Sequence, residues 1–326
     1  MNYFITGATG FVGSWVAQEL ARKGEQVTCL VRKTSNLKWL KGLPAAYHYG
    51  SLLEPETLKE GIRNADYVLH IAGVTKALSL KEFYSGNVEA TRNILEVVKA
   101  ENPGIKKFVH ISSQAAAGPS AGKLPKDETA PANPLTDYGR SKLQSEETAR
   151  QYMEFFPLTI LRPPTVYGPR DTDVFEVFKN VRMGVNLKVG SNDPVVSIIH
   201  AFDLARGIMV AAEHPKSSGE TFFISNEEPC AWSEVIDILQ KLMHKKVLTI
   251  PIPYPLAYSA GAAMELAARL SGKPTILNRQ KIREVRAGYW VASSRKIKEY
   301  LGFTPRLSLQ QGLKETLEWY QEHKWL

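Results

Sequence analysis

The chain begins MNYFITGATGFVGSWVAQEL (residues 1–20), and three glycines spaced three residues apart decide how this stretch folds. The run Tyr3-Phe4-Ile5 before the glycines is apolar and typical of a short strand, and the apolar residues after them recur at helical spacing. The glycines therefore lie where a strand turns into a helix. Such a turn presents unpaired backbone N–H groups at the positive end of a helix dipole, which favours binding of a phosphate.

Each glycine has a separate part in this prediction. Gly7 permits the tight turn, Gly10 lets the backbone approach a pyrophosphate, and Gly13 lets the helix pack closely on the strand. Phe11 and Val12 belong to the same cofactor-binding turn. The alternative is a glycine-rich turn without a ligand, but the position at the end of the first strand favours the ligand.

The end of the second predicted strand, VTCLVRK (27–33), indicates which dinucleotide is bound. A carboxylate at this position would bind the ribose 2′-hydroxyl of NAD. Val31 stands there instead, followed by Arg32 and Lys33. Because positive charge suits a 2′-phosphate, Arg32 predicts NADP, with NAD as the alternative.

Composition and charge limit the class of protein. The chain has 326 residues, of which 44% are hydrophobic, enough for one large core or a main domain with a smaller partner. The formal net charge of +8 is consistent with binding nucleotide phosphates. The basic residues are dispersed along the chain, so we expect a small-molecule substrate and no nucleic acid.

The two cysteines, Cys29 and Cys230, form no CxxC pair, so neither a disulfide framework nor a metal site is expected. A reducing compartment fits this usage, and no signal peptide is visible, so we expect a cytoplasmic protein. The apolar stretch 255–270 contains Glu265 and Arg269 and is too short to span a bilayer. No integral membrane segment is expected.

Strand-like and helix-like segments alternate in the first half of the chain, which predicts an α/β fold of the Rossmann type with a doubly wound parallel sheet. We expect a dinucleotide-binding domain over 1–170 and a smaller, mainly helical substrate lobe over 171–326. Segments near 195–225 are expected to return to the main domain. The expected strands are 2–6, 26–31, 46–49, 66–71, 106–111 and 158–162, and the expected helices between them are 11–23, 55–63, 80–100 and 136–155.

A candidate proton donor lies in DYGRSKLQSEE (137–147). Tyr138 and Lys142 are four residues apart and share a helix face. A nearby ammonium lowers the pKa of a tyrosine, which can then exchange a proton with a substrate oxygen. Tyr320 and Lys324 have the same spacing, near the end of the chain, and receive no catalytic role.

Serines follow the fifth predicted strand in HISSQAAAG (110–118). Ser112 and Ser113 are expected at the carboxyl edge of the sheet, where ligands bind in such folds. A hydroxyl there could hold the substrate oxygen. The alternative is that these serines only make local backbone hydrogen bonds.

Six segments together, in order over residues 1 to 170, resemble the extended short-chain dehydrogenase/reductase family: TGATGFVG, HIAG (70–73), NVEATRNIL (87–95), HISSQAAAG, YGRSK and LRPPTVYGP. The resemblance implies that Ser113, Tyr138 and Lys142 form the family's catalytic triad, with Ser112 as the fallback. It also implies that Asn87 supports the site geometry and a proton relay.

The same resemblance implies further cofactor contacts. Pro163 and Val166 match the segment beside the nicotinamide, and Ala72 and Gly73 end the HIAG segment. The family often has Gly-Asp-Leu near the adenine, with the Asp carboxylate beside it, whereas this chain has Gly50-Ser51-Leu52. The resemblance therefore implies that Ser51 and Leu52 lie near the adenine, with a hydroxyl in place of the carboxylate. Helices 80–100 and 136–155 match those through which family members dimerise, so a homodimer is an open alternative to a monomer.

The sequence is less specific about which branch of the family the chain resembles. Nucleotide-sugar members often carry an arginine where PVVSIIHAFDLA (194–205) has Val196, and a valine cannot pair with a diphosphate. His200 and Asp203 are interpreted as structural, with Asp203 capping the next helix. The leading hypothesis is an NAD(P)-dependent oxidoreductase that moves hydride between nicotinamide and an apolar ketone or secondary alcohol. The alternatives are a nucleotide-sugar 4-epimerase or dehydratase with tightly bound NAD, and a non-catalytic dinucleotide-binding protein.

Overall fold

The computed structural model describes residues 1–275 and 277–326, and in them a parallel sheet of seven strands lies in the order β11-β6-β5-β4-β1-β2-β3. Strand order runs outward from β1 in one direction and from β4 in the other, so the predicted doubly wound sheet is confirmed. Its strands are β1 (Asn2–Thr6), β2 (Gln26–Val31), β3 (Ala45–Tyr49), β4 (Tyr67–His70), β5 (Lys107–Ile111), β6 (Leu158–Arg162) and β11 (Thr221–Phe223).

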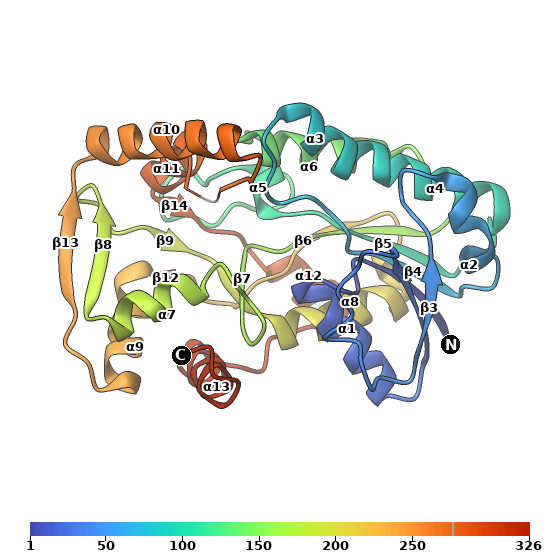
Figure 1. Cartoon of the computed structure of the whole chain (residues 1–326). Helices are drawn as coiled ribbons and strands as arrows, with labels where there is room; N and C mark the ends of the chain where they lie inside the picture. Colours follow the sequence, from blue (N-terminus) through green and yellow to red (C-terminus); the bar gives the residue numbers. More distant parts are fainter. Residues whose placement is uncertain (276) are drawn as a thin grey trace.

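Helices cover both faces of this sheet (Figure 1). One hydrophobic cluster joins Ile5 and Leu69 to the helices on one face, and a second joins Phe4 and Val68 to those on the other. Burial on both faces explains why the strands are continuous apolar runs. The first face carries α1 (Phe11–Arg22) and α8 (Ala201–Glu213), and the second carries η1 (Pro55–Leu58), α2 (Lys59–Arg63), α4 (Ala90–Glu101) and α6 (Asp137–Arg150).

The helix expected over 80–100 is divided into three parts: α3 (Leu80–Tyr84), a π-helical turn η2 (Ser85–Glu89), and α4. Gly86 permits the change, since a Cβ at this residue would lie 2.2 Å from a methyl carbon of Val74. Single π-turns inside helices are frequent at functional sites. Hydrophobic spacing alone could not show this turn.

The second half of the chain contributes to two regions. β11 extends the main sheet beside β6, and α8 packs on α1, while a third hydrophobic cluster around Phe178, Leu239 and Leu317 forms the core of the smaller lobe. The remaining elements are α5 (Gln114–Ala117), β7 (Thr165–Tyr167), α7 (Phe175–Arg182), β8 (Val185–Val189), β9 (Val195–Val196), β10 (Ile198–His200), η3 (Pro215–Ser217), β12 (Cys230–Ala231), α9 (Trp232–Met243), β13 (Leu248–Ile252), α10 (Tyr254–Ser271), α11 (Arg279–Ala287), β14 (Tyr289–Trp290), α12 (Arg295–Leu301) and α13 (Leu309–Glu322).

Two elements of the smaller lobe were not predicted. Strand β8 pairs with β13 in a two-stranded parallel ribbon, and α11 begins at the cap residue Asn278, whose side chain accepts a hydrogen bond from the Lys281 N–H. Ile282 is the one buried residue of α11, so hydrophobic spacing does not reveal this basic helix. Across the described residues, no helix combines the length and hydrophobicity needed to cross a membrane.

Candidate active site

The glycine turn between β1 and α1 has the geometry of a phosphate-binding loop. Gly7 has a φ of +74°, and a Cβ there would lie 2.7 Å from the Ala72 backbone nitrogen. A Cβ at Gly13 would lie 2.2 Å from the Gly7 carbonyl oxygen. Gly10 is the N-cap of α1 and offers its first turn no side-chain acceptor. The N–H groups that begin α1, around Phe11 and Val12, are therefore free to donate to a pyrophosphate, so these residues fit a dinucleotide.

The loop after β4 joins this turn to the predicted catalytic residues. Ala72 donates its N–H to the Thr6 hydroxyl at 3.2 Å and lies against Gly7. Gly73 is exposed, and a Cβ at this residue would lie 3.1 Å from Asn87 Oδ1 and 3.7 Å from Lys142 Nζ. The glycine turn and α6, the helix predicted to carry the catalytic residues, are therefore neighbours.

Adjacent serines at the end of β5 have different partners. Ser112 is buried and donates to Glu146 Oε1 at 2.6 Å, behind the site. The Ser113 side chain is close enough to Tyr138 to lower the pKa of that phenol, and its oxygen accepts the Ala115 N–H as the cap of α5. Of the two serines, Ser113 is the one that faces Tyr138.

Charge in the site differs from the expectation based on spacing. Desolvation raises the pKa of Tyr138, the charge of Glu284 raises it further, and the Ser113 hydrogen bond opposes the shift. Lys142 is buried, and its ammonium donates to the Ile111 carbonyl oxygen at 2.7 Å. Burial lowers the pKa of Lys142 to about 8. The predicted lowering of the Tyr138 pKa by Lys142 is absent here, because desolvation of the phenol outweighs the other effects.

The π-turn η2 holds Asn87 in the interior. Its Oδ1 accepts the Val74 N–H at 2.7 Å, and its Nδ2 donates to the Val74 carbonyl at 3.0 Å and to Ser141 Oγ at 2.8 Å. The side chain thus ties the loop after β4 to helix α6. This contact positions Gly73 next to Lys142.

Sequence reasoning missed the polar network beneath Asn87. The His70 ring bonds to the Thr6 hydroxyl at 2.8 Å and the Thr91 hydroxyl at 3.0 Å, and Thr91 donates to the Asn87 carbonyl at 2.6 Å. Burial lowers the pKa of His70 to about 3, so the ring is neutral at neutral pH. The histidine of the HIAG segment, directly after an apolar strand, is the signal that could have revealed this network.

Sequence reasoning also missed a buried charge cluster behind Ser112. Glu146 is fully buried and accepts two hydrogen bonds from Arg162, at 2.9 and 2.7 Å, and one from Arg150 at 3.0 Å. Burial alone would raise the pKa of Glu146, but the hydrogen bonds and charge of Arg162 hold it below its usual value. This cluster fixes α6 against β6.

The other predicted cofactor residues lie at the carboxyl ends of strands. Arg32 directly follows β2, and its side chain is exposed. Ser51 follows β3, and its hydroxyl accepts the Leu53 N–H at 3.3 Å within a local turn. Among the described residues, no hydrogen bond or ion pair joins Arg32 or Ser51 to the catalytic group. Leu52, Pro163 and Val166 are also held locally: the Leu52 carbonyl accepts from Asn93, the Pro163 carbonyl accepts from the Gln114 N–H, and Val166 is half-buried in β7.

His200 and Asp203, near β10, both have structural roles, as expected, but His200 and not Asp203 caps the next helix. His200, not Asp203, is the N-cap of α8, with Nδ1 accepting the Phe202 N–H at 3.3 Å. Asp203 accepts the backbone N–H groups of Arg306 and Leu307, each at 3.0 Å. The prediction that Asp203 caps the helix is wrong, because its carboxylate instead holds the segment before α13.

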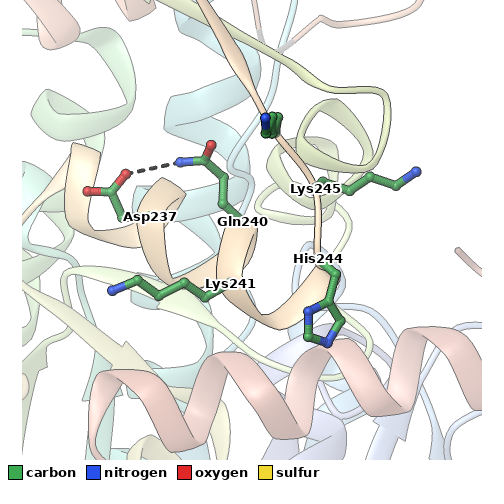
Figure 2. A pocket seen from close by; sticks show the side chains of 6 residues that line it. Asp237, Gln240, Lys241, His244 and Lys245 are labelled. Carbon is green, nitrogen blue, oxygen red and sulfur yellow. Dashed lines mark hydrogen bonds between the residues drawn. The ribbon is translucent and has the colours of Figure 1, made fainter.

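A separate depression lies at the C-terminal end of α9 (Figure 2). Gln240 donates to Asp237 at 3.0 Å on one side of it, and the basic side chains of this helix end form the other side. No residue of the predicted site lines this depression. Its lining consists of Asp237, Gln240, Lys241, His244, Lys245 and Lys246.

Comparison with known proteins agrees with this geometry. The model of the NAD-dependent epimerase/dehydratase family matches residues 3–225. The chain is 28% identical over 322 residues to a ceramide reductase of Caulobacter vibrioides, covering 99% of this chain and 95% of that protein. It is 27% identical to a decarboxylating sterol-4-alpha-carboxylate 3-dehydrogenase of Saccharomyces cerevisiae, covering 98% of both.

A solved structure extends the match to the whole fold. The crystal structure of gox2253 superimposes with a TM-score of 0.81 at 26% identity, covering 98% of each chain. The curated relatives and the solved structure match nearly the full length of the chain, and the family model matches residues 3–225. The chain belongs to the NAD-dependent epimerase/dehydratase family and is an enzyme of the extended short-chain dehydrogenase/reductase type that uses a nicotinamide dinucleotide.

Proposed function

We propose that this enzyme is an NADP-dependent reductase that interconverts an apolar ketone and its secondary alcohol. The observation that carries the proposal is the position of the buried Lys142 ammonium, which donates to the Ile111 carbonyl at the end of β5 and lies beside Gly73, in the loop that contacts the glycine turn. Tyr138 precedes Lys142 by one helical turn, and Ser113 opposes the rise of its pKa. This arrangement supports a proton donor and an oxygen-binding hydroxyl beside a dinucleotide turn.

We propose that residues 1–170 form the dinucleotide domain and residues 171–326 the substrate lobe, with 195–225 returning to the main domain. In this division the substrate binds between the smaller lobe and the side chains of Ser113, Tyr138 and Lys142.

The proposed mechanism assigns each side chain one task. The chemistry that the bound dinucleotide supplies is hydride exchange with the carbinol carbon. Ser113 donates a hydrogen bond to the substrate oxygen. Tyr138 is protonated at neutral pH, because desolvation raises its pKa, so it can give its proton to the oxygen as negative charge develops. The Lys142 ammonium stabilises the tyrosinate that remains, and Asn87 keeps the loop and helix in place.

The proposed cofactor is NADP because of the side chain after β2. The glycine turn would hold the pyrophosphate, Lys142 the nicotinamide ribose, and Arg32 the 2′-phosphate. Arg32 is exposed at the carboxyl end of β2. The preceding residue is Val31, so no carboxylate is present there to bind the ribose 2′-hydroxyl of NAD. Ser51 and Leu52 near the adenine, and Pro163 and Val166 near the nicotinamide, complete the proposed contacts.

An apolar substrate fits the surroundings of the site. The Phe83 ring of α3 lies 6.2 Å from the Tyr138 ring. Val196 is buried in the hydrophobic cluster of the smaller lobe, so it offers no charge to a sugar diphosphate. The names of the ceramide reductase and of the sterol dehydrogenase describe action on lipids, which supports a lipid-like ketone here.

The central test is NADPH oxidation with a long-chain aliphatic ketone and a 3-ketosteroid. We expect Tyr138→Phe to lower kcat at least about 100-fold while the Kd for NADPH stays within about twofold. Tyr320→Phe is the matched control, since Tyr320 has the same spacing to a lysine but donates to the Asp171 carbonyl. Turnover that survives Tyr138→Phe would contradict the catalytic assignment.

The cofactor is tested by binding. We expect the wild-type enzyme to bind NADPH more tightly than NADH, and Arg32→Glu to weaken NADPH binding at least about tenfold by repelling the 2′-phosphate. Lys41→Glu makes the same charge change at an exposed residue in the same β2–β3 connection and serves as the control. Stoichiometric NAD released from the purified protein on denaturation would instead favour an epimerase cycle, in which the cofactor stays bound.

A further inference from the structure

The outward face of α10 is unusually apolar. Its 18 residues, YPLAYSAGAAMELAARLS, contain two charged side chains, Glu265 and Arg269. Leu256 is 62% exposed, Leu266 60% and Leu270 82%, and Met264 is exposed as well. Contiguous apolar surface of this kind marks an interaction site on a folded protein.

The inward face of α10 is fixed by contacts with α11, so these side chains cannot turn inward. A Cβ at Gly261 would lie 3.0 Å from the Asn278 carbonyl carbon, which shows how closely the two segments approach. Glu265 accepts hydrogen bonds from Arg279 at 2.8 and 3.0 Å. Figure 1 shows α10 on the outside of the smaller lobe, over α11. No segment of the described chain covers its outer leucines.

The helix beneath α10 reaches the catalytic residues. Gln280 of α11 accepts the Asp137 N–H at 2.6 Å, and Glu284 accepts from the Thr136 hydroxyl at 3.4 Å. Thr136 and Asp137 directly precede Tyr138 in α6. Whatever surface α10 contacts is therefore linked through one helix to the active site.

Charge around α10 indicates the kind of surface. The neighbouring helix α11, RQKIREVRA, contains four Lys or Arg residues and one Glu. Arg283 of α11 donates to the Tyr258 hydroxyl of α10 at 3.1 Å, so basic side chains border α10. The single acid of α10, Glu265, pairs with both Arg269 and Arg279. Apolar side chains flanked by cations complement an anionic lipid surface.

The dimensions of α10 argue against a second copy of the chain as the partner. A helix of this length is about 27 Å long, so one face about 10 Å wide covers roughly 270 Å². A stable protein interface buries about 800 Å² on each partner. The outer faces of α4 and α6 carry exposed polar residues such as Arg92, Glu96 and Glu147.

We propose that α10 is an interfacial helix that docks this enzyme on anionic phospholipid bilayers. Leu256, Leu266 and Leu270 enter the boundary between headgroups and acyl chains, and Arg269 and Lys273 contact the headgroup phosphates. Docking places α11 and the active site next to the bilayer, from which an apolar ketone can enter. The proposal goes beyond the proposed reaction, and vesicle binding can be measured without substrate.

The test is co-sedimentation of the full chain with vesicles of phosphatidylcholine alone and of phosphatidylcholine with about 30 mol % phosphatidylglycerol. We expect binding to the anionic vesicles that weakens as salt is raised. We expect Leu266→Asp with Leu270→Asp to lower the partition coefficient at least about tenfold, because each change places a charge among acyl chains. Arg269→Gln with Lys273→Gln should lower it on anionic vesicles only.

Matched controls separate docking from misfolding. Phe155→Asp alters another exposed hydrophobic residue, in the chain between α6 and β6, and should bind vesicles like the wild type. Circular dichroism and the NADPH Kd should be unchanged in the α10 variants. Absence of vesicle binding by the wild type, or equal binding by the double-aspartate variant, would overturn the proposal. So would a wild-type dimer in light scattering that the same variant converts to a monomer without a change in vesicle binding.

Discussion

Ser112 and Ser113 are chemically identical neighbours whose environments give them different tasks. The buried Ser112 hydroxyl donates to Glu146 at 2.6 Å, whereas Ser113 acts on Tyr138 and lowers the pKa of its phenol. Successive residues in extended backbone point to opposite sides, which is why one serine reaches the interior and the other the site. The proposed catalytic serine is therefore selected by orientation.

This difference gives a prediction at the residue scale. We expect Ser113→Ala to lower kcat/KM for ketone reduction about 100-fold, because the substrate oxygen loses a donor. We expect Ser112→Ala to change kcat/KM less than threefold but to lower the free energy of unfolding by about 1–2 kcal/mol, since Glu146 Oε1 loses one of its two buried donors. Steady-state kinetics and urea unfolding of both variants check this. A large loss of kcat/KM in Ser112→Ala with little loss in Ser113→Ala would instead assign the catalytic role to Ser112.

At the scale of elements, α6 is held on the sheet by charge as well as by packing. Glu146 faces β6, where Arg162 donates to both of its oxygens in a fork-like pair. Arg150, one helical turn after Glu146, adds a third donor at the edge. The helix that carries Tyr138 and Lys142 thus has a fixed rotation about its axis.

We expect Glu146→Gln to lower the free energy of unfolding by about 3 kcal/mol or more, because the buried Arg162 loses its counter-charge. Acid should weaken the wild type through the same contact: the pKa of Glu146 is lower in the folded state, so its contribution is present above the carboxyl's ordinary pKa and is lost as pH falls through the folded value. Urea unfolding at neutral pH measures the loss. Glu147→Gln, one residue on and exposed, is the control, and a similar loss there would refute the argument.

At the scale of the whole molecule, a charge on the smaller lobe acts on the pKa of Tyr138 in the main domain. Glu284 of α11 is 146 residues from Tyr138 in the chain, yet its charge contributes to the raised Tyr138 pKa. Its carboxylate accepts from Thr136, the cap residue of α6. This contact joins α11 of the smaller lobe to α6, the helix that carries Tyr138.

We expect Glu284→Gln to lower the Tyr138 pKa. Because Tyr138 acts in its protonated form during reduction, the more alkaline of two declines in kcat/KM, the one caused by loss of the Tyr138 proton, should then occur at a lower pH than in the wild type. The decline associated with Lys142, whose pKa is about 8, should stay in place. A pH–rate profile of ketone reduction measures both, with Glu299→Gln of α12 as an exposed control. Identical profiles for Glu284→Gln and wild type would exclude this coupling.

Much of the main domain was predictable from local pattern. The alternation of strands and helices and the glycine turn are local properties, because backbone sterics, side-chain periodicity and the missing Cβ act within a few residues. The spacing of Tyr138 and Lys142 likewise follows from helix geometry. The fold class and the position of the dinucleotide turn were therefore determined by the sequence by itself.

Other features depend on contacts between residues far apart in the chain. The orientation of Ser113, the π-turn at Asn87 and the Glu146–Arg162 pair required partners that local spacing does not specify. Desolvation, which raises the pKa of Tyr138 and lowers that of Lys142, exists only once the surrounding elements have packed. Only the tertiary structure decided these features, together with the outward direction of the α10 leucines, since burial and charge environment are properties of the assembled core.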